Sequence, residues 1–398
     1  MNDINVEINN FGPIHKANIN IANINVVSGY NATGKSTISK LLYCIFKATS
    51  EKRQTFAYDS LMPRINIITA KLNDKQHFIF ANRKKSLKDM LDDYENAKNN
   101  YFQFVDYDDS RTAYYLEDIE IMDNILKVVN QNGFGLYKSI LKSLIESEFL
   151  INKIYGNFKI SGSFNNRYFN YFSDFSSNNF SSEGDVSFYD VFYIDSFSFF
   201  DIFNSRRSKL NNYFYTHDEY LKKILQKNKE DIVDIFDSNI NENAILIENK
   251  LKRLIKGEIK YENGKFLYYS NNLESYPMKN TSLGFNRIGI IQMLLSNREL
   301  KENSLLIIDE PELHLDPILQ QEMAAILVVL AKCLDVLIYI NTYSPAILEW
   351  LDYFCAYYNF KGSLNFYLTE PAKEEGKFNL NKVEYDKLLN FLSINNNI

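Results

Sequence analysis

The chain has 398 residues, 45% hydrophobic and 24% charged, and its 44 basic residues stand against 50 acidic ones, for a net charge of −6. At about 150 residues per domain, this length predicts two or three structural units and a sizeable core. The acidic balance argues against a protein that coats nucleic acid with its whole surface, so any DNA contact must come from a local patch.

Cysteine usage and hydropathy indicate the compartment. Cys44, Cys333 and Cys355 are widely spaced and form neither a disulfide framework nor a paired metal motif. The first residues carry no basic flank and no apolar run, so no signal peptide is expected. The most apolar stretch, 324–340, contains charged residues and is too short to span a bilayer. We therefore expect a soluble, cytoplasmic protein without a membrane partner.

The first 50 residues alternate short apolar runs with turns. They predict strands at 4–8, 17–21 and 24–28. A glycine-containing loop follows, and then apolar residues at helical spacing from Ile38 onward. The order is therefore strand, loop, helix.

The middle of the chain is less regular. A charged helix is expected at 87–101 and one or two long helices at 117–155. The segment 161–184, rich in Ser, Asn and Phe, predicts a loop, and 191–194 predicts a buried strand. Residues 217–256 are predicted to be mostly helical and basic.

The last third is regular again. Asn263-Gly264 between apolar runs at 258–261 and 266–269 predicts a hairpin with a type I′ turn. Beyond it, helices are expected at 288–295, 318–332, 346–350 and 382–392, and strands at 305–308, 336–340 and 364–367.

Strands that alternate with helices favour a largely parallel sheet. The two ends of the chain therefore predict one α/β domain, formed by 1–50 and 241–398, with a mainly helical insertion or regulatory region at 51–240.

Residues 29–37 fit the phosphate-loop pattern G-x-x-x-x-G-K-[ST]. The loop amides and the following helix N-terminus suit an anion, Lys35 suits the β- and γ-phosphates of ATP, and Ser36 suits Mg²⁺. The alternative is a chance glycine turn, which the strand before and the helix after disfavour. The residues expected to bind nucleotide are Gly29, Tyr30, Asn31, Ala32, Thr33, Gly34, Lys35, Ser36 and Thr37.

An apolar strand ends in two carboxylates, Asp309 and Glu310. In phosphate-loop folds, an Asp at this place holds Mg²⁺ through water, so Asp309 is a candidate metal ligand together with Ser36. Glu310 is the candidate base for the attacking water, with Lys35 as the second catalytic residue. The alternative is a pair of solvated acids in a turn.

Three segments together resemble a known family. Ile8-Asn-Asn-Phe-Gly-Pro-Ile14, the loop with Asn31, and Asp309-Glu-Pro-Glu-Leu-His-Leu-Asp-Pro317 resemble ABC-type ATPases of the SMC, RecF and OLD group. The resemblance is closest to the stand-alone, OLD-like ATPases often found in bacterial defence systems, and it covers roughly 1–50 and 240–398. It implies a P-loop NTPase of α/β class: an ABC-type head domain with a mixed sheet and a largely helical insertion.

In that family two heads sandwich ATP, and each completes its partner's site with a Ser-Gly signature. The resemblance therefore implies a homodimer or higher oligomer, in which Ser282 and Gly284 act in trans. The alternative is that Ser282 only caps the following helix. His314, Leu315 and Asp316 resemble the D-loop, which faces the partner's nucleotide.

One position departs from the family pattern. The family usually reads Thr-His-Ser-Pro after the next strand, whereas this chain has Tyr343 in place of the switch histidine. A phenol carries no positive charge near pH 7, which predicts slow turnover or an effector governed by ATP binding more than by hydrolysis. The alternative is that Tyr343 is a packing residue.

OLD nucleases carry a Toprim nuclease after the ATPase, and no second acidic cluster of the Asp-x-Asp type follows Asp309 here. The four histidines, His15, His77, His217 and His314, are scattered without zinc spacing. We therefore expect a separate effector, a nuclease or toxin, that this chain regulates.

DNA is a further candidate partner, because basic residues gather in the middle of the chain. Acidic residues interleave with them, which favours an ordinary solvated face. The basic residues are Arg206, Arg207, Lys209, Lys222, Lys223, Lys227, Lys229, Lys250, Lys252, Arg253 and Lys256.

The sequence thus favours a cytoplasmic, Mg²⁺-dependent ATPase that dimerises around ATP and controls an effector in antiphage defence. Two alternatives stay open: a RecF- or SMC-like repair ATPase that acts on DNA directly, and a nucleotide-sensing scaffold with negligible hydrolysis.

Overall fold

The computed structural model describes residues 4–72, 87–104, 119–120, 122–123, 126–127, 134–149, 158–164, 167–172, 189–195, 215–227, 242–271, 274–281 and 283–395. The chain forms two compact units. The larger comprises Met1–Glu51, Ile151–Ser208 and His217–Ile398, and the smaller comprises Lys52–Leu150 and Lys209–Thr216.

A mixed, ten-stranded sheet forms the larger unit, with the order β5-β4-β1-β2-β13-β12-β3-β11-β10-β6. Its strands are β1 (Ile4–Phe11), β2 (Ile14–Asn20), β3 (Ile24–Gly29), β4 (Lys159–Phe164), β5 (Arg167–Phe172), β6 (Val191–Ile194), β10 (Leu305–Asp309), β11 (Leu337–Asn341), β12 (Leu364–Pro371) and β13 (Phe378–Val383). Both ends of the chain contribute strands to this sheet, and the mixed α/β class expected from the sequence is confirmed.

The strands that carry the site run parallel. β12, β3, β11, β10 and β6 are consecutive parallel neighbours, and β3, β10 and β6 are buried along their whole length. Strands buried on both faces are continuous apolar runs, as in Leu305–Ile308. Their carboxyl ends meet at one edge of the sheet, so the residues that follow β3, β10 and β11 come together there.

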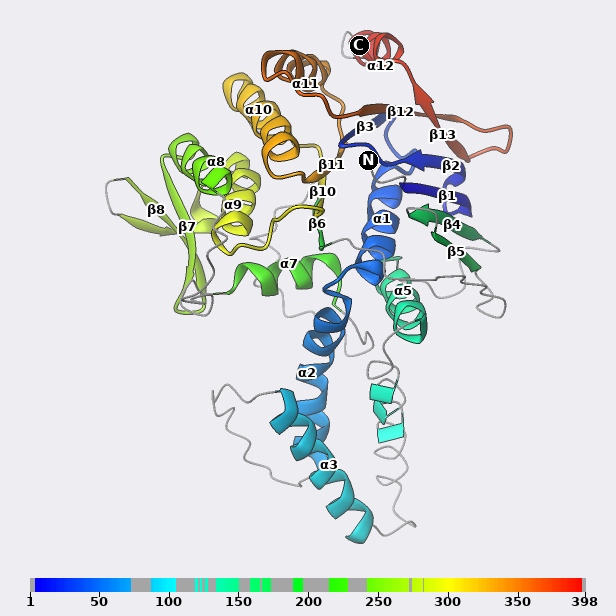
Figure 1. Ribbon diagram of the computed structural model, residues 1–398, viewed down its shortest axis with the longest axis vertical. Coiled ribbons are helices and arrows are strands. Elements are labelled where there is room, and N and C mark those ends of the chain that lie inside the picture. Colours follow the sequence, from blue (N-terminus) through cyan, green and yellow to red (C-terminus); the bar gives the residue numbers. More distant parts are fainter. Residues whose placement is uncertain are drawn as a thin grey trace. The chain divides into compact units, whose positions relative to one another are not determined.

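Helices cover both faces of these parallel strands. Figure 1 shows α1 (Lys35–Thr49) on one side of them and α10 (Pro317–Cys333) and α11 (Pro345–Tyr357) on the other. α10 and α11 both begin with proline at the first helical position after a capping side chain. Among the described residues, this unit also contains the α-helices α7 (His217–Leu225), α8 (Glu242–Leu254), α9 (Leu283–Ser296) and α12 (Tyr385–Asn395).

A second, three-stranded antiparallel sheet consists of β7 (Gly257–Glu262), β8 (Lys265–Ser270) and β9 (Ser275–Pro277), and a short 3₁₀ helix, Met278–Asn280, follows it. At its first turn, Asn263 and Gly264 have φ angles of 51° and 76°. Positive φ at both central residues is the geometry of a type I′ turn, so the predicted hairpin is confirmed.

The smaller unit is helical where the structure describes it. It contains α2 (Arg53–Leu72), α3 (Leu87–Phe104) and α5 (Phe134–Phe149). The Lys98 ammonium on α3 lies 3.1 Å from the Asp123 carboxylate, to which the Tyr94 hydroxyl also donates a hydrogen bond. The expected helix at 87–101 is confirmed.

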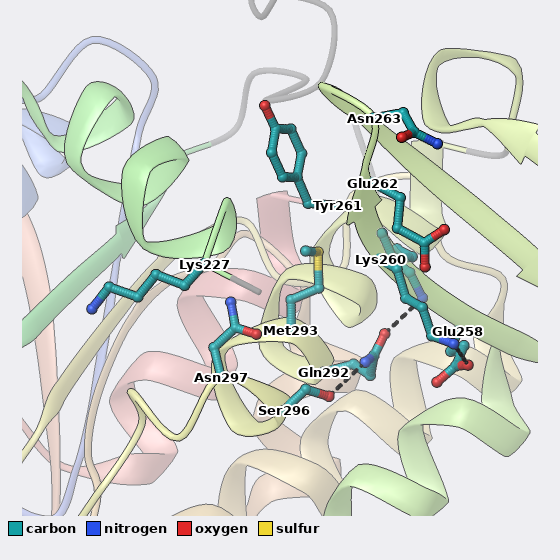
Figure 2. Close-up of a pocket in the computed structure, with 11 residues that line it drawn as sticks. Lys227, Glu258, Lys260, Tyr261, Glu262, Asn263, Gln292, Met293, Ser296 and Asn297 are labelled. Atoms are coloured by element: carbon teal, nitrogen blue, oxygen red, sulfur yellow. Dashed lines mark hydrogen bonds and ion pairs between the residues drawn. The ribbon is translucent and has the colours of Figure 1, made fainter. Parts of the chain in front are cut away.

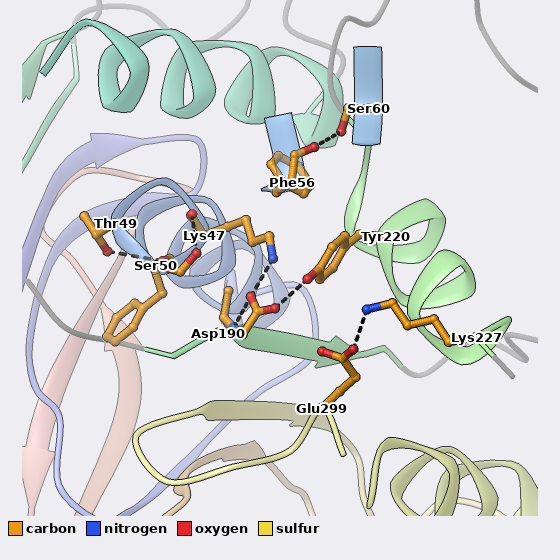
Figure 3. A network of polar contacts seen from close by, with 11 residues as sticks. Lys47, Thr49, Ser50, Phe56, Ser60, Asp190, Tyr220, Lys227 and Glu299 are labelled. Carbon is orange, nitrogen blue, oxygen red and sulfur yellow. Dashed lines mark hydrogen bonds and ion pairs between the residues drawn. The ribbon is translucent and has the colours of Figure 1, made fainter. Parts of the chain in front are cut away.

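A buried ion pair ties α1 to the amino end of β6. Lys47 Nζ lies 2.5 Å from Asp190 Oδ1, and both side chains are fully buried. Tyr220 on α7 donates its hydroxyl to the other carboxylate oxygen, and its ring faces the ammonium at 3.4 Å (Figure 3). The ammonium thus has a carboxylate and an aromatic face as partners within the core.

The sequence reading was wrong at one segment. Residues 161–164 and 167–172, expected in a loop, belong to β4 and β5, which pair with each other and extend the sheet beyond β1. The aromatic residues of RYFNYF suit a strand, and pairing with β1 satisfies the backbone of the Ser- and Gly-containing β4. Residues 173–184 lie outside the described part of the chain.

The predicted domain boundaries at 50 and 240 stay a prediction, although β4, β5 and β6 lie between them and join the main sheet. Among the described residues, none of the helices combines the length and the apolar composition that a bilayer crossing requires.

Candidate functional site

The loop between β3 and α1 has a backbone that only glycine permits at two positions. Gly29 has φ 146° and Gly34 has φ 92°. A Cβ on Gly29 would lie 1.7 Å from Thr369 Oγ1, and a Cβ on Gly34 would lie 2.5 Å from Ile14 Cδ1. The loop therefore needs both the conformation and the space of glycine, as a cradle for phosphate does.

Lys35 is the first residue of α1, and its side chain folds back over the loop. Its ammonium donates hydrogen bonds to the carbonyl oxygens of Gly29, at 3.0 Å, and Tyr30, at 2.7 Å. The side chain is only 5% exposed. Burial lowers the pKa of Lys35 to about 8, against the opposing charges of Glu310 and Asp309. Lys35 is thus a desolvated cation, which a phosphate would stabilise.

The other residues of the loop fit the expectation in part. Thr33 is buried and its hydroxyl lies 2.7 Å from that of Thr369 on β12. Ser36, Asn31 and Ala32 are exposed, and Tyr30 is exposed with its ring against Phe391 of α12, at a centroid distance of 5.1 Å. An exposed Ser36 hydroxyl at the start of α1 is accessible to a metal ion.

Asp309 ends β10 and is buried, and three side chains hold its carboxylate. Ser39 Oγ donates to Oδ1 at 2.9 Å and Asn341 Nδ2 to the same oxygen at 2.6 Å. Tyr193 donates its hydroxyl to Oδ2 at 2.8 Å. These three donors fix the orientation of the Asp309 side chain beside α1.

Sequence reasoning missed these three donors. Asn341 lies directly opposite Asp309 in the β10–β11 register. Pairing of these two expected strands, which the sequence analysis did not predict, would have been the signal for it. Ser39 lies one helical turn beyond Lys35, on the buried side of α1. Tyr193 comes from β6, and only the strand order places it beside β10.

Glu310 follows Asp309 with φ 52°, an uncommon conformation for a non-glycine residue. Its amide donates to the carbonyl of Asn341 at 2.8 Å. Burial lowers the pKa values of Lys35 and Arg287, and the charge of Glu310 opposes this shift, so the carboxylate lies within electrostatic reach of both cations. Such a backbone conformation costs about 1–3 kcal/mol for a non-glycine residue.

Arg287 on α9 is a second cation that sequence reasoning missed. It is 4% exposed, and its guanidinium donates to the carbonyl oxygens of Leu313, at 3.3 Å, and Asp309, at 3.4 Å. Burial lowers its pKa, against the charges of the surrounding carboxylates. Arg287 therefore ties α9 to the loop that follows β10.

The start of α9 packs closely on the 310–316 loop. A Cβ on Gly284 would lie 2.4 Å from the carbonyl oxygen of His314 and 3.0 Å from Leu315 Cδ2. The segments that resemble the signature and the D-loop are thus neighbours within one chain. Ser282 lies outside the described residues, so its capping alternative is not decided.

The three D-loop candidates have different surroundings. His314 is exposed with φ 63°, and Leu315 is buried. The Asp316 carboxylate accepts hydrogen bonds from the amides of Ile318 and Leu319, both at 2.9 Å, and caps α10. Asp316 therefore has a structural role whatever it contacts in a partner.

Tyr343 lies over the phosphate loop. The Lys35 ammonium is 4.1 Å from the centre of the Tyr343 ring, a cation–π contact. Burial, with the charges of Glu310, Asp309 and Glu312, raises the pKa of Tyr343 to about 12, so the phenol is neutral at pH 7. The structure therefore brings this residue to the site, and not merely into the core.

Glu312, another residue that sequence reasoning did not single out, holds the Tyr343 segment. Its Oε1 accepts hydrogen bonds from Thr342 Oγ1 at 2.7 Å and from the Tyr343 amide at 3.0 Å. Burial raises its pKa despite these donors. The loops after β10 and β11 are thus linked through one carboxylate.

A pocket of about 430 Å³ lies between β7 and α9, lined by Lys227, residues 258–263, Gln292, Met293, Ser296 and Asn297 (Figure 2). None of these residues belongs to the phosphate loop or to the strand-end carboxylates. The pocket is therefore separate from the candidate nucleotide site.

The basic residues give little support for a DNA-binding face. Lys250 pairs with Glu322 at 2.7 Å, and Lys252 pairs with Glu248 and Glu258 at 2.8 and 2.9 Å. Such pairs are typical of a solvated surface. Arg206, Arg207, Lys209 and Lys229 lie outside the described residues, as does His77.

A family model described as an AAA ATPase domain matches residues 1–348. No curated protein sequence matches the chain significantly.

Similar solved structures include the SMC head domain from Thermotoga maritima, which is 12% identical and has a TM-score of 0.38. The match covers 96% of this chain and 98% of that chain. A nucleotide-free ATP-binding cassette from an ABC transporter is 14% identical and has a TM-score of 0.34, and the match covers 99% of this chain and 96% of that chain. A Smc head domain with a coiled coil and joint, derived from Pyrococcus yayanosii, has 10% identity, covers 100% of both chains and has a TM-score of 0.40.

Proposed function

Because the chain belongs to the AAA ATPase domain family, we propose that it is a Mg²⁺-dependent ATPase that dimerises around ATP and controls a separate effector. The observation that carries the proposal is the convergence of Lys35, Asp309 and Glu310 at one edge of the sheet. An ammonium in a glycine cradle, a fixed acidic side chain for Mg²⁺ and a second acidic side chain for the attacking water are groups that phosphoryl transfer uses.

The residues fit Mg²⁺-ATP. The Lys35 ammonium is held by two loop carbonyls, and phosphate oxygens are stronger acceptors for the same hydrogens. Ser36 and Asp309 offer the hydroxyl and carboxylate oxygens that Mg²⁺ prefers, with Asp309 acting through water. When bound, the metal supplies charge neutralisation on the phosphates.

The chain's own residues then have distinct tasks. Lys35 holds the β- and γ-phosphates, and the loop amides orient them. Glu310 accepts a proton from the attacking water. Ser39, Asn341 and Tyr193 hold the Asp309 side chain in place through hydrogen bonds.

Two matched variants test these assignments. Lys35→Ala removes the main cation of the phosphate site and should abolish ATP binding in calorimetry. Glu310→Gln keeps the shape and should preserve ATP binding while steady-state ATPase activity falls strongly, with ATP-stabilised dimers in size-exclusion chromatography. Wild-type nucleotide affinity in Lys35→Ala, or wild-type turnover in Glu310→Gln, would remove the respective role.

Dimerisation has its own test, because we propose that Ser282 and Gly284 reach ATP bound to another chain. Ser282→Arg should leave ATP binding intact and block head engagement. Mixed with Lys35→Ala, it should form heterodimers with one intact composite site, and partial ATPase activity should return. If Ser282→Arg alone turns over at the wild-type rate, Ser282 is only a helix cap.

The effector and the antiphage role rest on the resemblance of residues 309–317 to OLD-like ATPases. Affinity purification of the chain from its native host, with and without Glu310→Gln, tests them. A nuclease or toxin that co-purifies, and whose action depends on the ATP state, supports the proposal. Strong DNA-stimulated ATPase activity of the isolated chain would favour direct action on DNA instead.

One observation favours the scaffold alternative. The Tyr343 phenol, neutral at pH 7, occupies the place over Lys35. It offers no positive charge to a developing phosphate anion. If the Glu310→Gln variant controls the effector as strongly as the wild type does, ATP binding without hydrolysis suffices for that control.

A further inference from the structure

Asp195, His217 and Asp218 bring an imidazole and two carboxylates together at the carboxyl end of β6. His217 Nε2 lies 3.7 Å from Asp195 Oδ2 and 3.3 Å from Asp218 Oδ1. The three potential ligand atoms all lie within 4.8 Å of one another. Asp195 directly follows β6 and His217 begins α7, so the fold assembles a group that sequence spacing does not reveal.

We propose that these three residues form a binding site for a transition-metal dication of the Zn²⁺ class, distinct from the Mg²⁺ that accompanies ATP. Imidazole nitrogen combined with carboxylate oxygen suits Zn²⁺ and related ions, whereas Mg²⁺ prefers oxygen ligands alone. Three protein ligands leave further coordination positions open for water or a substrate group.

The spacing of the ligand atoms supports this assignment. At metal–ligand distances of about 2.1 Å, two ligands in a tetrahedral shell are roughly 3.4 Å apart. The two distances from His217 Nε2 lie on either side of that value. The Asp195 and Asp218 oxygens also lie within 4.8 Å of each other.

The surroundings fix the imidazole. His217 is 4% exposed, and its ring packs at 4.5 Å from the ring of Tyr193 and 5.9 Å from that of Tyr43. A held ring loses little conformational entropy on binding a metal.

The site is adjacent to the candidate ATP site. Ile194 pairs with Ile308, so Asp195 follows β6 where Asp309 stands on β10. Tyr193 packs on His217 and donates its hydroxyl to Asp309. One side chain thus contacts both sites, and a metal that fixes His217 would also restrain Tyr193.

The test uses the full chain, stripped with a chelator and free of nucleotide and Mg²⁺. Titration with Zn²⁺ in calorimetry should give one ion per chain, and Co²⁺ should give the visible absorption of a low-coordinate nitrogen- and oxygen-ligated ion. His217→Ala should weaken Zn²⁺ binding at least about 100-fold, and Asp195→Asn at least about tenfold.

Two controls separate this site from others. His15, an exposed histidine 3.8 Å from Glu374, is a matched pair on the surface, and His15→Ala should leave Zn²⁺ affinity unchanged. Asp309→Asn should also retain Zn²⁺ binding even if it loses Mg²⁺-ATP, so failure of the proposed function and failure of this proposal are distinguishable.

Absence of Zn²⁺ binding by the wild-type chain, or equal affinity in the wild type and His217→Ala, would overturn the proposal. Because His217 is buried, circular dichroism checks that its variant folds. If it does not fold, Asp218→Asn decides, since Asp218 lies at the half-buried start of α7. Unchanged Zn²⁺ affinity in that folded variant would equally refute the site.

Discussion

Replacing Gly284 with alanine tests how closely α9 packs on the loop after Glu310. The added Cβ would lie 2.4 Å from the backbone oxygen of His314, which cannot move by itself, so the helix or the loop must shift. Overpacking of this kind costs about 1–3 kcal/mol. The higher helix propensity of alanine offsets up to about 1 kcal/mol of this loss in the free energy of unfolding. We expect a net loss of roughly 1–2 kcal/mol in the free energy of unfolding.

Gly289, on the same helix, provides the matched control. A Cβ there would lie 1.8 Å from Ile259 Cδ1, the far end of a side chain that can change rotamer. Gly289→Ala should therefore destabilise the protein less than Gly284→Ala in urea unfolding followed by circular dichroism. Only Gly284→Ala should also slow ATPase turnover, because it displaces the loop that carries His314. Equal stability of the two variants, with wild-type turnover in Gly284→Ala, would refute the close packing.

Other expected outcomes concern the buried cations and the switch position. Lys47→Met leaves Asp190 as a buried, uncompensated charge and should cost about 3–5 kcal/mol in urea unfolding, whereas Lys47→Met combined with Asp190→Leu should recover much of it. Since the pKa of Lys35 is lowered to about 8, the side chain is charged below that pH and neutral above it. ATP affinity in calorimetry should therefore be constant below about pH 7 and fall by up to about tenfold per pH unit above 8, and a flat profile up to pH 9.5 would exclude a charge requirement. Tyr343→His should raise the ATPase rate near pH 6.5, whereas Tyr343→Phe should not, and an unchanged rate in Tyr343→His would show that the missing histidine does not limit turnover.

The parts of the site that follow one another in sequence were predictable. Gly29 to Thr37 lie between a strand and a helix, and Asp309 and Glu310 end an apolar run, so local pattern alone locates them. Arg287 was not predictable, because an arginine in a helix is ordinarily exposed and only the packing of α9 on residues 309–313 buries it. Tyr193 and Ser39 reach Asp309 across separations of 116 and 270 residues, which no local pattern reports.

The same distinction holds for the fold. The hairpin at Asn263-Gly264 was predictable because its type I′ turn needs positive φ at two consecutive residues, which Asn and Gly adopt readily. β4 and β5 were missed because their strand character depends on β1, a partner far away in the chain. β13, which we did not predict, likewise depends on pairing with β2 and β12.

The place of β3 in the sheet has a consequence for biosynthesis. Ile24 pairs on one side with Ile338 and on the other with Leu364, so the strand that leads into the phosphate loop gains its neighbours only when the last third of the chain has been translated. Pairings of such sequence separation form slowly and late. Once the first 50 residues have left the ribosome, the nascent chain therefore exposes this unpaired, apolar strand for most of its synthesis. Chaperone binding protects such a state against aggregation. Competence to bind nucleotide should accordingly appear only after residues 364–371 have left the exit tunnel.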